Sequence, residues 1–71
     1  MGGYRSGQFA FTARPREKNA WYVSNTDGRS WLVRLYSSTG KFMIVTNTPQ
    51  RRDVAVSGEL GKKIIRAVRE L

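Results

Sequence analysis

The chain of 71 residues carries 13 Lys and Arg against 5 Asp and Glu, so its net charge is +8, and it contains neither Cys nor His. A chain of this length has room for one small domain, and the missing residue types exclude disulfides and the usual ligands of zinc, iron–sulfur and haem sites. No stretch comes near the roughly 20 apolar residues of a membrane span, and residues 1–7 lack the apolar run of a signal peptide, so we expect an intracellular protein of the cytoplasm or nucleoid without a membrane partner.

Hydrophobic residues, 39% of the chain, fall in separate blocks, which is typical of a folded domain. We expect residues 1–7, rich in Gly and Ser, to form a flexible basic arm, and residues 8–71 to form one small domain of sheet and helix. Period-two alternation over residues 8–13 predicts the first strand. Pro15 is expected to end this strand, because its fixed dihedral angle and missing N–H disfavour a strand ladder.

Three further strands are predicted in the middle of the chain. Residues 20–24 and 30–36 are rich in aromatic and β-branched residues, and the Asp-Gly pair between them is a strong hairpin signal. Residues 41–46 return after a second turn at 37–40, so these strands form a meander.

The last third of the chain predicts a short edge strand and a helix. A polar loop over residues 47–53 precedes the candidate edge strand at 54–56. Ser57 is the expected N-cap, and Glu59 suits the positive end of the helix dipole. Apolar residues then recur at the steps of an amphipathic helix, at Leu60, Ile64, Ala67, Val68 and Leu71.

These elements predict an α+β fold in which a four- to five-stranded antiparallel meander packs on one C-terminal α-helix. One face of the sheet would form the core with the helix, and it carries Phe9, Phe11, Trp21, Val23, Trp31, Val33, Phe42 and Ile44. The opposite face is half apolar, with Ala10, Thr12, Tyr22, Ser24, Leu32, Arg34, Tyr36, Met43 and Val45.

Catalysis is disfavoured, because general acid and base chemistry draws mostly on His, Cys and carboxylates held in a cleft. The carboxylates here have local explanations in turns, a helix end and charge pairs, and no two have the spacing of a shared site. Gly40-Lys41 is followed by Phe42 and lacks the remaining glycines of a phosphate-binding loop. We therefore expect no enzyme, no cofactor and no metal site.

The positive charge points instead to a polyanionic partner, because a field of this sign attracts nucleic acid and basic contacts release its counterions. The bland alternative is a basic surface that is merely solvated. Against it, the basic residues cluster: Arg14, Arg16 and Lys18 in one predicted loop, Arg51 and Arg52 in another, and Lys62, Lys63, Arg66 and Arg69 on the helix.

The leading hypothesis is a nucleic-acid-binding domain, with DNA favoured. Bases or a groove would meet the open sheet face through Tyr22, Arg34 and Tyr36, although the two tyrosines could equally be cross-strand neighbours that stiffen the sheet. Phosphates would be held by Arg14, Arg16, Lys18, Arg51 and Arg52. Single-stranded DNA, duplex DNA and RNA all remain open as targets.

The alternative is a small interaction or inhibitor protein of the phage or plasmid type, which docks on an acidic protein surface. Leu32, Met43, Val45 and the basic helix face would form the contact, with charge steering the encounter. Exposed apolar residues often mark an interface, so a homodimer through the sheet face or the helix is a further candidate.

Two resemblances accompany this interpretation. The order of elements over residues 8–71 resembles that of the single-stranded-DNA-binding transcriptional coactivators and their Whirly and PUR relatives, which implies a dimer that binds on a curved sheet. The spacing of Trp21-Tyr22-Val23, Ser30-Trp31-Leu32-Val33 and Ser38-Thr39-Gly40-Lys41 before the closing helix resembles the amino-terminal arm-binding domain of phage integrases, which implies a three-stranded sheet in the major groove of duplex DNA. The strand at 9–13 and the connection at 47–53 depart from the integrase pattern.

Overall fold

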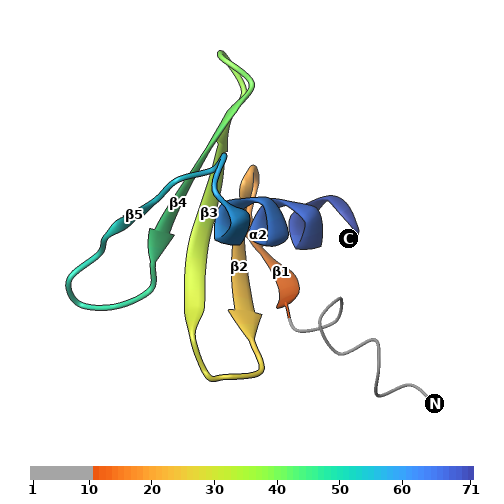
Figure 1. The fold of residues 1–71 in the computed structure, drawn as a ribbon. Helices are drawn as coiled ribbons and strands as arrows, with labels where there is room; N and C mark the ends of the chain where they lie inside the picture. The colour runs from red at the N-terminus through yellow and green to blue at the C-terminus, as the bar shows by residue number, and fades with distance from the viewer. Residues whose placement is uncertain (1–10) are drawn as a thin grey trace.

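The computed structural model describes residues 11–71, so the expected arm at 1–7 and the start of the first strand, with Phe9 and Ala10, lie outside the described residues. An antiparallel five-stranded sheet in the order β1-β2-β3-β4-β5 is followed by one helix (Figure 1). This confirms the α+β meander with a C-terminal helix. The elements are β1 (Phe11–Glu17), β2 (Ala20–Asn25), β3 (Ser30–Tyr36), β4 (Lys41–Thr46), β5 (Asp53–Val54) and α2 (Glu59–Arg69).

The two predicted hairpin turns are present, and both contain a glycine in the left-handed region. Gly28 has φ +87° in the β2–β3 turn, and Gly40 has φ +72° in the β3–β4 turn. The first turn is further held by Asn25, whose Oδ1 accepts hydrogen bonds from the backbone N–H groups of Asp27 at 3.1 Å and Arg29 at 2.9 Å. Local sequence is therefore sufficient to direct these reversals.

The first strand extends further than expected, because Pro15 does not end it. β1 runs to Glu17, and Pro15 lies opposite Trp21 in the ladder with β2. The register then shifts between Pro15 and Glu17. A proline is tolerated on an edge strand and next to a bulge, where its missing N–H breaks no ladder bond. Arg14 and Arg16 consequently lie on a strand, and the predicted loop shrinks to a turn at Lys18 and Asn19.

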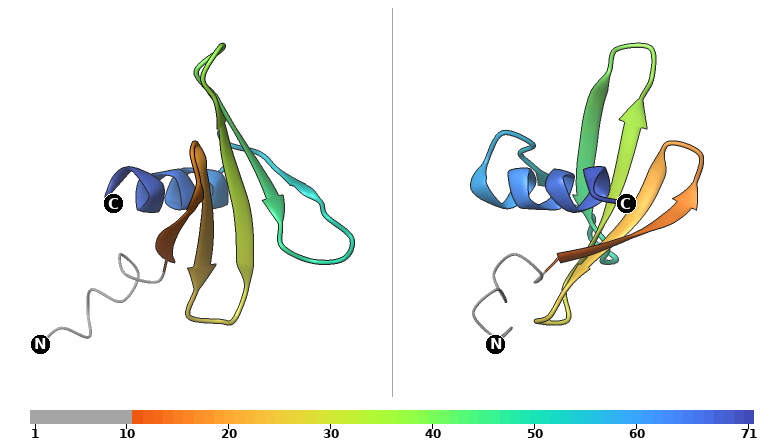
Figure 2. Two further views of the ribbon diagram at one scale, coloured as in Figure 1. Left: turned by 180° about the vertical axis from the view of Figure 1, so that it is seen from behind. Right: turned by 90° about the vertical axis from the view of Figure 1, so that its right-hand side faces the viewer.

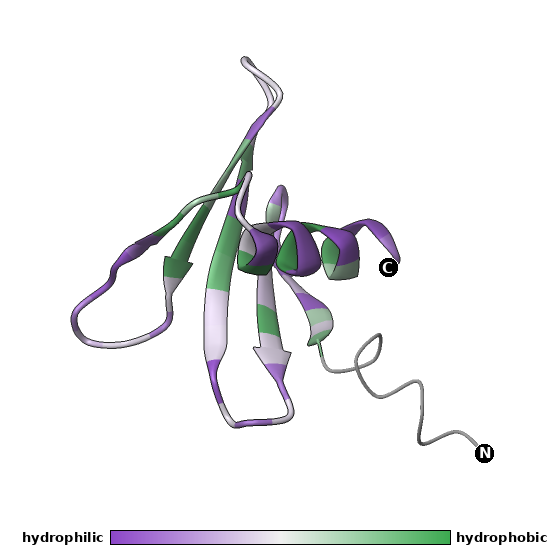
Figure 3. Ribbon diagram, in the orientation of Figure 1, coloured by the Kyte–Doolittle hydropathy of each residue, from purple (hydrophilic) through white to green (hydrophobic). Residues whose placement is uncertain are grey.

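The predicted core face is confirmed in the described residues. Val23, Trp31, Val33 and Ile44 are buried on the side that faces α2, together with Ala13. Phe11 packs on Trp31 with ring centroids 5.6 Å apart, and half-buried Trp21 packs on Phe42 at 6.2 Å. The hydropathy colouring shows hydrophilic and hydrophobic segments alternating along α2, whereas β4 is mostly hydrophobic (Figure 3).

The helix differs from its prediction at the cap and in its buried stripe. The N-cap is Gly58 rather than Ser57, and no side chain caps the helix. Leu60 and Leu71 are exposed, whereas Ile65 is buried with Ile64 and Val68. The rotation follows from Gly61, because a Cβ at this position would overlap backbone atoms of Ala55 and Val56. The side of the helix that carries Gly61 therefore packs closely against residues 55 and 56. With the helix in this rotation, Ile65 points into the core.

The helix covers only one face of the sheet. It packs chiefly against β1 and also against β2, and views from behind and from the side show no element of residues 11–71 on the opposite face (Figure 2). We call this opposite surface the open face. The edge strand β5 has two residues, Asp53 and Val54, and ends before the predicted 54–56 segment is complete. Among residues 11–71, no helix is long and apolar enough to cross a membrane.

Candidate nucleic-acid interface

The strand register places the predicted tyrosines and Arg34 on the open face. One row across the sheet runs from Arg14 through Tyr22 and Leu32 to Val45, because these residues are successive register partners. The next row runs from Ala20 through Arg34 to Met43. Tyr36 follows at the end of β3, opposite Lys41. Neighbouring partners on antiparallel strands project from the same face, so these side chains share one surface.

Three arginines from separate parts of the chain meet on this surface. One pocket is lined by Arg16 of β1, Arg34 of β3 and Arg51 of the β4–β5 loop. The apolar side chains of the open face that line the same pocket are Leu32, Met43 and Val45. The result is a hydrophobic floor with guanidinium groups around it, which we call the open-face pocket.

The tyrosines are accessible, and each is held by a neighbour. Tyr22 is 38% exposed, and the Arg16 guanidinium carbon lies 5.7 Å from its ring centroid, in cation–π range. Tyr36 is 43% exposed, and its hydroxyl donates to Met43 Sδ at 3.6 Å. Four residues of strand rise separate the Tyr22 row from Tyr36, which is about 13 Å. The open-face pocket lies along this span.

The floor of the pocket is more deeply buried than an open sheet face would require. Leu32 is only 9% exposed, whereas Met43 beside it is 45% exposed. Leu32 lines the pocket together with Arg16, Arg34 and Arg51, and arginine side chains commonly lay their aliphatic stems along apolar surface while the charged group stays in water.

Two carboxylates temper the positive charge of the open face. Arg34 Nη2 lies 3.0 Å from Glu17 Oε2, in an ion pair whose side chains are 43% and 55% exposed. Asp53 is the register partner of Val45. The basic residues on this surface are more numerous: Arg14, Arg16, Arg34, Lys41 and Arg51.

Not every predicted basic residue joins this surface. Arg52 lines a different hollow with Thr46, Pro49 and Gln50, and its backbone N–H donates to Thr46 Oγ1 at 2.9 Å. Lys18 lies in the β1–β2 turn at the margin of the sheet. The structure therefore separates Arg51 from Arg52, although the two are adjacent in sequence.

Lys41 is the residue that sequence reasoning missed. It faces Tyr36 across the β3–β4 ladder and so extends the basic surface to the end of the sheet. The signal was available, because strand alternation from Met43 and Val45 places Lys41 on the same side. The sequence places Lys41 in the predicted strand at 41–46, but its charge is considered only in the context of a phosphate-binding loop.

The site contains no candidate metal centre, since within residues 11–71 no three carboxylates gather where they could hold an ion. Comparison of the chain with protein-family models, with curated proteins and with solved structures finds no match. The functional argument therefore rests on the geometry of the open face.

Proposed function

We propose that the protein binds nucleic acid on the open face of its sheet, and that the preferred form is single-stranded. The observation that carries this proposal is the convergence of Arg16, Arg34 and Arg51 around an apolar floor, between two exposed tyrosines. The arginines suit the phosphates of a nucleic-acid strand, and the rings and the apolar floor suit its bases.

The guanidinium groups supply the electrostatic part. Arginine binds phosphate through charge-assisted hydrogen bonds in a planar fork, and contacts of this kind give affinity without regard to sequence. The net charge of +8 adds a long-range attraction that accelerates the encounter.

The rings and the apolar floor supply the part that favours single strands. Bases stack on exposed aromatic rings for about 1–3 kcal/mol each, and this requires bases that are not already stacked within a duplex. Tyr22 and Tyr36 are exposed for stacking, and Met43 between them offers further apolar surface. A duplex groove would use the arginines and leave these groups largely unused.

The test compares labelled single-stranded DNA, single-stranded RNA and duplex DNA by fluorescence anisotropy. Replacing Tyr22 and Tyr36 together by Ala is expected to weaken single-strand binding by at least about tenfold and to change duplex binding little. The matched control replaces both by Phe, which retains the rings and should retain the affinity. Circular dichroism verifies that each variant is folded.

The comparison of the two double variants decides the outcome. If the Ala variant binds single strands as tightly as the Phe variant, the tyrosines are not stacking platforms. If duplex DNA binds more tightly than either single strand and both variants behave alike, the preference for single strands is wrong.

A further inference from the structure

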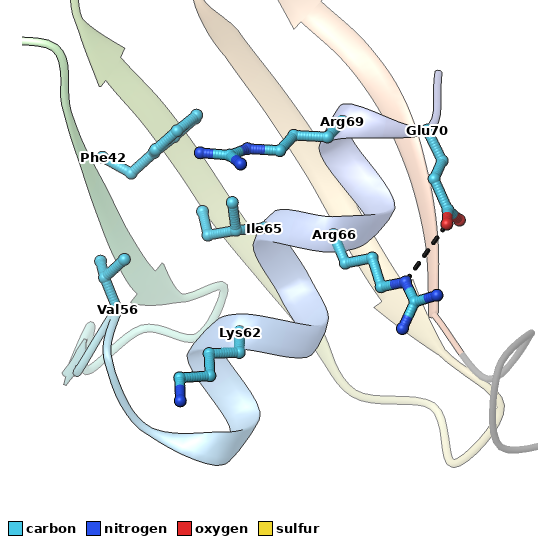
Figure 4. Close-up of a pocket in the computed structure, with 7 residues that line it drawn as sticks. All are labelled: Phe42, Val56, Lys62, Ile65, Arg66, Arg69 and Glu70. Atoms are coloured by element: carbon cyan, nitrogen blue, oxygen red, sulfur yellow. Dashed lines mark hydrogen bonds and ion pairs between the residues drawn. The ribbon is translucent and has the colours of Figure 1, made fainter.

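A second surface, on the helix side of the sheet, is independent of the open face. A groove between the helix and the last strands has an apolar floor. The floor is formed by Phe42 of β4, Val56 of the connection between β5 and α2, and Ile65 of α2. Figure 4 shows Ile65 and Arg69 pointing from the helix toward Phe42, with Lys62 near Val56. The Arg69 guanidinium carbon lies 5.9 Å from the Phe42 ring centroid.

The charge at this groove is positive. Arg66 is paired with Glu70, the Nε to Oε2 distance being 3.3 Å, and both point away from Phe42 in Figure 4. Lys62 and Arg69 border the apolar floor, and neither has an ion pair among residues 11–71. A ligand that fits the groove therefore combines apolar groups with negative charge.

The backbone of β4 is also incompletely paired beside this groove. β5 pairs only with Ile44 and Val45, so within residues 11–71 no strand flanks the outer edge of β4 at Lys41–Met43. The N–H of Thr46 donates outward to the Arg52 carbonyl at 2.9 Å. In an antiparallel strand, the backbone N–H and C=O groups of every second residue point to the same side. Phe42 lies four residues before Thr46, so its N–H and C=O also point outward, away from β3.

We propose that the groove and the free edge of β4 together bind an extended acidic segment of a partner protein. The segment adds as a strand beside Phe42, as in other cases of strand addition to a sheet edge. Alternate side chains enter the groove over Phe42 and Ile65, and its carboxylates meet Lys62 and Arg69. The partner is a peptide rather than a nucleic acid because the edge of β4 offers backbone N–H and C=O groups that a second polypeptide backbone can pair with.

The probe is a terminally blocked eight-residue peptide that alternates Asp or Glu with Leu, Val or Phe. It is titrated into the ¹⁵N-labelled full chain, and both chemical shifts and amide hydrogen exchange are followed by NMR. We expect saturable shifts at Phe42 and Ile65 and slower exchange of the Phe42 N–H, because strand addition gives that donor an acceptor. The same peptide with its backbone N-methylated at alternate residues should not bind.

Matched charge variants locate the contact. Lys62→Gln and Arg69→Gln should each weaken peptide binding about two- to fivefold, as expected for exposed charges. Lys63→Gln removes the same charge at an exposed position that does not line the groove, and it should leave the affinity unchanged.

Three results would overturn the proposal: no saturable binding at millimolar peptide, equal losses for Lys62→Gln and Lys63→Gln, or unchanged exchange at Phe42 when the peptide is bound. In a parallel titration, single-stranded oligothymidylate should shift the open face and leave the groove unaffected. If it instead displaces the peptide from Phe42, the groove is a nucleic-acid surface. Failure of the open-face proposal leaves the peptide result unchanged, so the two are tested separately.

Discussion

At the scale of single residues, Glu17 offsets part of the positive charge of the open face by pairing with Arg34. Its carboxylate pairs with Arg34 at 3.0 Å on an accessible surface, where an ion pair is worth little more than about 1 kcal/mol. A phosphate can therefore replace Glu17 as the partner of Arg34 at small cost. The same carboxylate repels the phosphates of a nucleic-acid strand that approaches Arg16 and Arg51.

Replacing Glu17 by Gln is accordingly expected to tighten single-stranded DNA binding by about two- to fivefold at low salt. The control is Glu70→Gln, which removes another exposed glutamate from an ion pair with arginine and changes the net charge equally. Because Glu70 is the C-cap of α2, on the helix side of the sheet and away from the open face, its removal should have a smaller effect. Equal gains in fluorescence anisotropy titrations would mean that only net charge matters.

At the scale of elements, the docking of α2 depends on the absence of a side chain at Gly61. The nearest atoms to a Cβ built there include the Val56 carbonyl oxygen at 2.7 Å and Val56 Cα at 2.8 Å, which are backbone atoms that cannot rotate away. The helix therefore approaches the preceding chain as closely as its backbone permits. This contact sets the rotation that buries Ile65 and presents Arg69 to Phe42.

Gly61→Ala should destabilise the protein by about 1–3 kcal/mol, because steric overlap outweighs the gain of about 1 kcal/mol in helix propensity. Gly58→Ala is the control, since the nearest atom to its Cβ lies at 3.5 Å and only the poorer N-cap preference of Ala opposes it. Urea denaturation followed by circular dichroism measures both. A Gly61→Ala variant as stable as the natural chain would show that the helix can shift without cost.

At the scale of the whole molecule, positive charge is distributed over two surfaces with different surroundings. The open face combines arginines with exposed tyrosines, whereas the helix side combines Lys62 and Arg69 with an apolar groove. In the proposed complex, a polyanion contacts the open face through specific arginines, and the remaining charge acts only at long range.

The salt dependence of binding should reflect this division. If Arg14, Arg16, Arg34 and Arg51 contact phosphates, the slope of log affinity against log salt for a single strand should be about −3. Arg51→Gln should reduce the slope by about 0.7, and Arg52→Gln, the same change at the next residue, should leave it unaltered. The measurement is anisotropy titration at several salt concentrations, and identical slopes for the two variants would remove Arg51 from the interface.

Much of this fold could be predicted from the sequence, because it depends on residues that are close together in the chain. Alternation places Trp31, Val33 and Ile44 on the face that meets the helix, and the Asp27-Gly28 pair directs a tight reversal. The same alternation places Tyr22, Arg34 and Tyr36 together on the other face. These features depend on a period of two and on turn chemistry, which neighbouring residues determine by themselves.

The remaining features could not be predicted from the sequence, because they depend on tertiary contacts. Pro15 stays in a strand only because that strand is at the edge, and Ile65 replaces Leu60 in the core only because Gly61 touches the chain before the helix. Arg51 lines the same pocket as Arg16 and Arg34, whereas Arg52 lines a different hollow. Sequence by itself determined the order of the elements, the two faces of the sheet and the excess of positive charge, because these are properties of short segments. Tertiary structure decided which arginines meet, since a loop side chain takes its position from contacts with residues distant in the chain.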